Sequence, residues 1–176
     1  MPYLIAMLKT LSNWLNFRVI ALSTSLLLLI FLPSLPLMAK TPPEMRNQED
    51  IELSRDMHGR ALNGFEFVKL DLRGVDLSEA DLRGAVFNNS QLQDSNLRGA
   101  DMEDVVAFAT VFKGADLRDV NLTNALLMES NFENARIEGA DFSNAVLNRI
   151  QQRQLCEVAG GTNPLTGSDT KFSLGC

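Results

Sequence analysis

Few side chains in this sequence are of the types that carry out catalysis, and those few are not grouped. His58 is the only histidine among 176 residues, and it precedes the repeated part of the chain. Nucleophilic catalysis by a serine needs a base and a group that orients the base, both within reach. Ser78 and Ser143 lack such a base, and there is no glycine-rich phosphate loop. The sequence therefore predicts no catalytic residues, no cofactor and no small-molecule substrate.

The two cysteines, Cys156 and Cys176, are the other residues with chemistry of their own. Both lie near the C-terminus. In an exported chain with an even number of cysteines, a disulfide between them is the expected state, because oxidising compartments favour such bonds. Two free thiols, or a metal pair that lacks its remaining ligands, are the alternatives.

The first 39 residues have the pattern of an export signal. Lys9 and Arg18 precede an apolar run of 14 residues, and small Ala39 stands before a polar stretch. This run is short for a membrane span. We predict that residues 1–39 are a signal peptide cleaved after Ala39, so that the membrane is contacted only through this signal. An uncleaved anchor is the alternative, because Leu37 is larger than signal peptidases prefer.

The chain beyond residue 39 is acidic. It carries 14 basic and 22 acidic side chains, which give a formal charge of −8. A surface of this sign repels phosphate backbones. We therefore expect no nucleic-acid partner.

A five-residue repeat fills the middle of the chain. From Leu62 to Leu147, every fifth residue is large and apolar, with Ala107 as the single exception among 18 centres. The residue two places before each centre is usually small, as Ala80 and Ser95 are. In an α-helix, fifth residues lie about 500° apart and spiral around the axis; in a strand they alternate between faces. A chain that turns a corner after each unit can instead direct every centre toward one axis.

This pattern resembles the pentapeptide repeat family, most plainly in GADLR at 114–118 and GADFS at 139–143. The resemblance implies an all-β solenoid, a right-handed quadrilateral β-helix in which four units form one coil. Eighteen units in residues 60–149 then give about 4.5 coils. Residues 20 apart would lie above one another. Glycines such as Gly114 would occupy corners, where positive φ costs them nothing.

The flanking segments are expected to cover the ends of the coil, whose unpaired backbone groups otherwise invite further pairing. Residues 40–59 form an N-terminal segment with a candidate capping helix. Residues 150–176 are expected to form a helical cap, because residues 148–159 have a helix-forming composition and two glycines follow. The ending from Leu155 to Cys176 resembles exported cyanobacterial members of the family and related chloroplast lumenal proteins. That resemblance implies a disulfide-bracketed cap and a location in the thylakoid lumen or periplasm.

One face of the expected coil is apolar on its outside. We call this surface the apolar wall; it comprises Val86, Val106, Phe108, Leu126, Met128 and Val146. Exposed apolar patches of this size usually mark contact surfaces. We predict that the wall binds a protein partner or a second copy of the chain. Coverage by the chain's own residues 40–59, and scattered apolar residues without a role, are the alternatives.

Another face carries acidic side chains in one column, at Asp81, Asp101, Asn121 and Asp141. Stacked carboxylates can bind a hard cation. Asp and Asn are also common in turns, where they accept hydrogen bonds from nearby backbone N–H groups. We predict the turn role and no metal site.

These features together predict a non-enzymatic structural or protein-interaction module of the thylakoid lumen or periplasm, which binds an unidentified protein through flat walls. The alternative comes from another branch of the same family, whose acidic rods mimic DNA and bind topoisomerases or other nucleic-acid-binding proteins. The export signal argues against this alternative, because it places the protein away from DNA.

Overall fold

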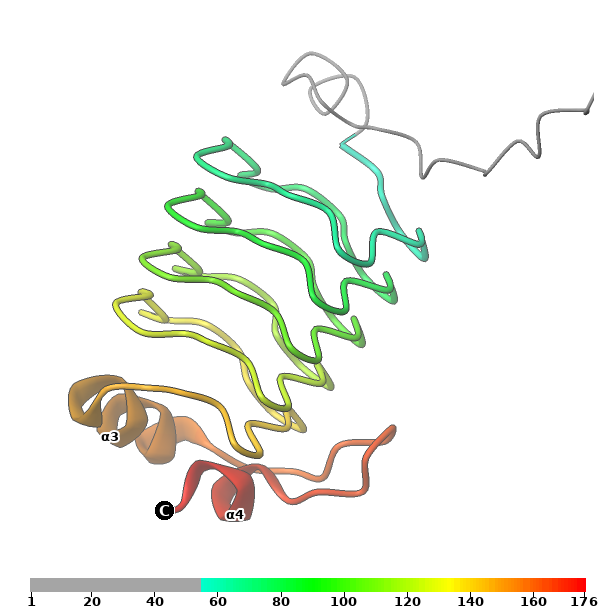
Figure 1. Cartoon of the computed structure of the whole chain (residues 1–176). Coiled ribbons are helices and arrows are strands. Elements are labelled where there is room, and N and C mark those ends of the chain that lie inside the picture. The colour runs from blue at the N-terminus through cyan, green and yellow to red at the C-terminus, as the bar shows by residue number, and fades with distance from the viewer. Residues whose placement is uncertain (1–54) are drawn as a thin grey trace, which may run out of the picture. The chain divides into compact units, whose positions relative to one another are not determined.

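The computed structural model describes residues 55–176 of the chain. The predicted signal peptide and residues 40–54 lie outside this part. Figure 1 shows the described residues as a stack of coils that ends in two helices, α3 (Arg149–Val158) and α4 (Thr170–Leu174), below the last coil.

Residues 20 apart pair between successive coils, as the repeat predicts. Fifteen parallel bridges join position i to position i+20, from Asp56 with Asp76 to Leu126 with Val146. Four five-residue units therefore separate each residue from its partner in the next coil. The Phe67 and Phe87 rings stack with centroids 4.7 Å apart and planes 7° from parallel.

The pairing differs from the expected all-β class in one respect. Every bridge within residues 55–176 is isolated, so no run of consecutive residues forms a strand there. The reason is local, since the chain bends two residues after each bridge and pairing cannot extend along it. Within residues 55–176 the coil is a ladder of single bridges and turns, and the helices α3 and α4 follow its C-terminal end.

Each unit turns through a left-handed residue. The second residue after the centre has positive φ in all 18 units from Gly59 to Asn144. Seven of these residues are glycines, which confirms the expected corners at positions such as Gly114. The other eleven carry side chains, and seven of them are Asn or Asp, the residues that tolerate this conformation best. The turn is thus fixed by the fold and not only by glycine.

The centres form one continuous core along the stack. Leu72, Phe87 and Leu117 are fully buried, and each fully buried Leu or Phe contributes roughly 1.5–3 kcal/mol relative to exposure. Met57 is also fully buried, one unit before the first expected centre. Residues 55–59, expected to belong to a capping segment, form a coil unit instead.

Hydroxyl groups inside the coil are hydrogen-bonded to the backbone of neighbouring coils. The Thr110 hydroxyl donates to the Phe87 carbonyl at 2.7 Å, and the Thr110 N–H donates to the Ser130 hydroxyl at 3.0 Å. The Ser130 hydroxyl in turn donates to the Ala107 carbonyl. Because buried polar groups are costly when unpaired, these bonds explain how Ser and Thr replace alanine on the inside.

Candidate protein-interaction surface

The twenty-residue pairing brings the residues of the apolar wall onto one face. Val86 pairs with Val106, Val106 with Leu126, and Leu126 with Val146. Phe108 and Met128 lie in the turns that follow the centres of the same units. The wall is therefore a column of apolar residues with a second column beside it.

The lower part of the wall is open to solvent. Phe108, Leu126 and Met128 are 45%, 45% and 44% exposed, whereas large apolar side chains in the core are almost fully buried. Val86 and Val106 are partly buried. Val68, which the predicted wall does not include, follows the centre Phe67 on the same face and is also exposed. The sequence could have placed Val68 in the wall, because it follows Phe67, and Phe67 lies 20 residues before Phe87.

Polar groups bound the wall at both ends. Glu66 begins the paired column. Asn88 accepts a hydrogen bond from the Phe108 N–H at 2.9 Å. At the other end, Asn148 caps α3 by accepting from the Ile150 and Gln151 N–H groups, both at 2.9 Å. These polar groups lie at the two ends of the predicted wall, and the exposed Val68 lies on the same face one coil before Asn88.

The acidic column is built from turn caps. The Asp81 carboxylate accepts from the Arg83 N–H at 3.3 Å, and Asp141 accepts from the Ser143 N–H at 2.8 Å. Asn121 does the same for Thr123 and also donates to Asp101 at 2.9 Å. The predicted turn role is confirmed. No cluster of three or more potential metal ligands occurs within residues 55–176.

Arginines two residues after aspartates neutralise part of the acidic surface of the coil, in the acidic column at Asp81 and on other faces at Asp71 and Asp116. A hydrogen bond from the Arg73 guanidinium lowers the pKa of Asp71 to about 2. Hydrogen bonds from Arg83 likewise lower the pKa of Asp81. The Arg118 guanidinium lowers the pKa of Asp116, which also lies 3.5 Å from Arg136. These aspartates are therefore ionised and already paired.

His58 and Ser78, which are 20 residues apart, lie in contact. The His58 Nδ1 atom is 3.0 Å from the Ser78 hydroxyl, contrary to the expectation that this serine has no base beside it. The hydroxyl donates to the Asp76 carboxylate at 2.5 Å, so the ring nitrogen donates to the hydroxyl oxygen. An imidazole that donates cannot accept the serine's proton. His58, Ser78 and Asp76 therefore form a hydrogen-bonded turn. Extending the repeat by one unit, to Met57, would have predicted the contact, because His58 and Ser78 are 20 residues apart.

Cys156 and Cys176 form a disulfide, as predicted. The bond joins Cys156 of α3 to Cys176, two residues after α4. The segment between the helices also contacts the coil, because the Asn163 side chain donates to the Val120 and Gly139 carbonyls at 3.0 and 2.8 Å. The C-terminal residues are thus linked to each other and to the last coil.

Residues 55–176 include no helix long and apolar enough to cross a bilayer.

Comparisons with known proteins agree with the repeat. Residues 66–105 and 110–149 match the pentapeptide repeats family in eight copies. A segment of 42 residues is 64% identical to the chloroplastic thylakoid lumenal protein TL20.3 of Arabidopsis thaliana. That match covers 24% of this chain and 15% of the relative, so it spans only a small part of the relative's length.

One solved structure shows the same kind of fold, and another is similar in sequence. The pentapeptide repeat protein Rfr23 of the cyanobacterium Cyanothece 51142 superposes with a TM-score of 0.51 at 20% identity, over 58% of this chain and 97% of Rfr23. A pentapeptide repeat protein of the Arabidopsis thaliana thylakoid lumen is 30% identical, over 74% of this chain and 93% of that one, with a TM-score of 0.30. The repeats, their pairing and these matches show that the chain is a repeat solenoid and belongs to the pentapeptide repeat family.

Proposed function

We propose that this protein is a non-enzymatic structural or protein-interaction module that binds a protein partner through the apolar wall. The observation that carries the proposal is the exposure of Phe108, Leu126 and Met128, each nearly half open on one continuous face. Association buries apolar surface at such a face, and each Å² removed from water contributes about 25 cal/mol to binding. A solenoid presents this surface on a rigid, flat support.

The proposed location is the thylakoid lumen. Two observations support it: the export pattern of residues 1–39 and the 64% identity of a 42-residue segment with a lumenal protein of Arabidopsis thaliana. A periplasmic location would use the same export pattern and the same oxidising conditions for the disulfide.

The proposed architecture is the right-handed, four-sided β-helix that the family resemblance implies, with a helical cap at its C-terminal end. The pairing of residues 20 apart and the position of α3 and α4 after the last coil support it. Arg73, Arg83 and Arg118 pair with Asp71, Asp81 and Asp116, so these three carboxylates are already neutralised, which counts against DNA mimicry.

Site-specific crosslinking tests the interaction. A photoreactive residue at position 108 should yield a crosslinked product of defined mass in intact cells, because Phe108 lies in the centre of the wall. The same residue at position 165 is the control, since Leu165 is 65% exposed but lies in the C-terminal segment. Adding Met128→Lys should abolish the product from position 108.

Two results would contradict the proposal. If position 108 gives no product beyond that of position 165, the wall contacts no partner. If the product joins position 108 to residues 40–54 of the same chain, the chain covers its own wall.

A further inference from the structure

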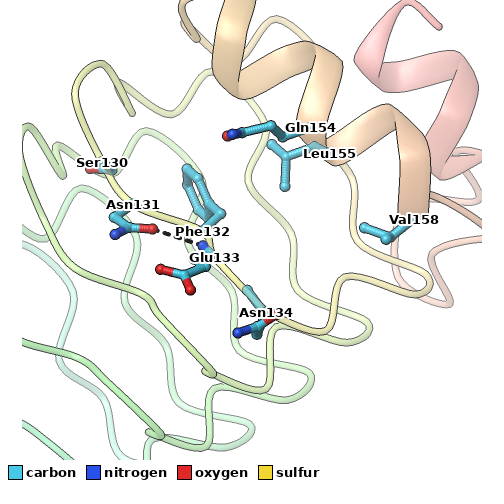
Figure 2. A pocket seen from close by; sticks show the side chains of 9 residues that line it. Ser130, Asn131, Phe132, Glu133, Asn134, Gln154, Leu155 and Val158 are labelled. Carbon is cyan, nitrogen blue, oxygen red and sulfur yellow. Dashed lines mark hydrogen bonds between the residues drawn. The ribbon is translucent and has the colours of Figure 1, made fainter.

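A hollow of about 580 Å³ lies at the C-terminal end of the coil stack. We call it the end groove; residues 130–135 of the last coil form one side, and Gln154, Leu155 and Val158 of α3 form the other. Figure 2 shows Phe132 inside the hollow, with Gln154 and Leu155 across from it. The groove is separate from the apolar wall, because it lies at an end of the stack and on a different face.

Two backbone donors in the end groove lack partners. One coil earlier on this face, the Phe112 N–H donates to the Asn131 carbonyl at 2.8 Å, and the Gly114 N–H donates to the Glu133 carbonyl at 2.9 Å. The corresponding N–H groups of Phe132 and Asn134 have no acceptor within residues 55–176. Phe132 and Asn134 therefore present the same N–H donors that pair with the following coil elsewhere in the stack.

On each of the next two faces, a residue of the C-terminal cap accepts a hydrogen bond from an N–H group of the last coil. On one, the Gly139 N–H donates to the Gly160 carbonyl at 2.8 Å. On the other, the Phe142 N–H donates to the Ser173 hydroxyl at 3.0 Å. Each of these faces thus has one of its two edge donors taken by a cap residue, whereas the end groove has neither taken.

The end groove also has an apolar floor. The Phe132 ring stacks on Phe112 with centroids 5.2 Å apart and planes 8° from parallel. Phe132 is the last ring of this column and is only partly buried, although Leu155 lies near it. Val158, at the rim, is 63% exposed. An apolar side chain placed beside Phe132 would continue the column.

The cap leaves room for one extended segment and not for a second rod. The Gln151 side chain donates to the Leu127 and Ser130 carbonyls at 2.8 and 2.7 Å. The Ser130 carbonyl is the one that would accept an N–H of a further coil, as the Thr110 carbonyl accepts from the Asn131 N–H. Asn163 fixes the segment after α3 against the last coil, because its side chain donates to the Gly139 carbonyl and to the Val120 carbonyl, which also accepts from the Asp141 N–H. End-to-end stacking of two copies is therefore blocked.

The charge of the groove favours a basic occupant. Glu133 is the only charged side chain among the residues that line it. Its ion pair with Lys113, at 3.0 Å, is about half exposed on both sides, and such pairs are worth little. A cation on the occupant can share this carboxylate.

We propose that the end groove binds one extended segment of a partner protein by adding it to the edge of the coil. The carbonyls of two residues in that segment accept from the Phe132 and Asn134 N–H groups, and the large apolar residue between them packs on Phe132. A flanking Lys or Arg contacts Glu133. This is strand addition, in which main-chain hydrogen bonds give affinity and alternate side chains give specificity. The proposal goes beyond the function of the wall, because it assigns a second site to a different surface.

A capped peptide of sequence Ala-Thr-Val-Phe-Lys-Gly-Ala, which copies residues 109–115, is a suitable probe. It supplies an aromatic residue between two carbonyls and a lysine beside it. On titration into the ¹⁵N-labelled full-length chain, the amide signals of Phe132 and Asn134 should shift more than those of Phe108 and Met128. A peptide with Asp in place of Phe is the control and should bind at least about tenfold more weakly.

Variants of the chain make the test specific. Val158→Trp should fill the groove and weaken binding of the peptide by about tenfold or more, and it should fold because Val158 is largely exposed. The matched control is Leu165→Trp, at a residue 65% exposed outside the groove, and it should bind as the wild type does. Phe108→Lys with Met128→Lys should leave peptide binding unchanged, which separates this site from the wall.

Three outcomes would overturn the proposal. The first is no binding at millimolar peptide, and the second is binding that shifts the signals of the wall instead of Phe132 and Asn134. The third is concentration-dependent dimerisation of the chain that Val158→Trp abolishes, because the occupant would then be a second copy.

Discussion

At the scale of single residues, the turn of each unit imposes a left-handed backbone on side chains that do not favour it. Ala109 has φ 53°, and alanine cannot offset this conformation by hydrogen bonds of its own side chain. For residues other than glycine the left-handed conformation costs roughly 1–2 kcal/mol. The fold tolerates this cost because the Ala109 N–H pairs with the Met128 carbonyl at 3.1 Å in the next coil.

We therefore expect Ala109→Gly to raise the free energy of unfolding by about 1 kcal/mol. The reciprocal control is Gly74→Ala, which should lower it by a similar amount, because an added Cβ there meets no atom within 4 Å and only the φ of 64° opposes it. Urea denaturation of both variants checks this pair. Equal effects of the same sign would show that the turn conformation does not limit stability.

Asp116 should make the stability of the coil depend on pH. Hydrogen bonds from Arg118 lower the pKa of Asp116 in the folded chain, and its side chain is only 19% exposed. A carboxyl group whose pKa falls on folding adds stability above its unfolded pKa of about 3.9, and that stability is lost as pH falls through the folded pKa.

Asp116→Asn should accordingly lower the free energy of unfolding by about 1–2 kcal/mol at pH 7, since it removes a charged acceptor from Arg118. The difference from the wild type should shrink as pH falls below about 4, because the unfolded wild-type chain then binds a proton at this carboxyl while the folded chain binds one only at lower pH. Urea titrations at several pH values measure it. A difference that stays constant from pH 7 to pH 2 would exclude this role for the carboxylate.

At the scale of elements, the C-terminal cap depends on local signals and on one covalent bond. Asn148 and Gln151 form a capping box at the start of α3, and Asp169 caps the five-residue α4. A helix as short as α4 is not stable by itself. The disulfide, which spans 20 residues of sequence, holds α4 against α3.

Replacing Cys156 and Cys176 with serine should lower the free energy of unfolding of the cap by about 3 kcal/mol on the loop-entropy model. Hydrogen exchange should report it, with faster exchange in α4 and little change in the middle of the stack, because the units of a solenoid contact mainly their neighbours. Equal acceleration near Leu97 and in α4 would show instead that cap and coil unfold as one unit.

The sequence predicted these elements unevenly. The helix α3 and the disulfide follow from composition and cysteine count. The five residues of α4 carry no periodic signal, and they depend on Asp169 before them and on Gly175 after them, whose φ is 71°. The isolated bridges were also not predictable from pattern alone, because a period of five fixes where the chain turns but not how many residues pair between turns.

At the scale of the whole molecule, the period of 20 made the apolar wall readable from the sequence. Once each residue is placed above the one 20 positions earlier, Val106, Leu126 and Val146 must share a column, and the structure pairs them. The sequence could not predict which backbone N–H groups at the C-terminal end of the coil stack are paired. Which N–H groups the cap leaves open depends on where Gly160, Ser173 and Gln151 lie in space, and no repeat encodes that.

The pairing of each residue with one 20 positions away also limits how the gene can lengthen. Duplicating one five-residue unit would keep every centre inward, but it would rotate all later residues onto the adjoining face and split the wall into two halves that no longer meet. Duplicating four units together would add one complete coil and extend the apolar wall without a break. Lineages that keep this surface should therefore gain or lose repeats in multiples of twenty residues, and shorter changes should be confined to its ends.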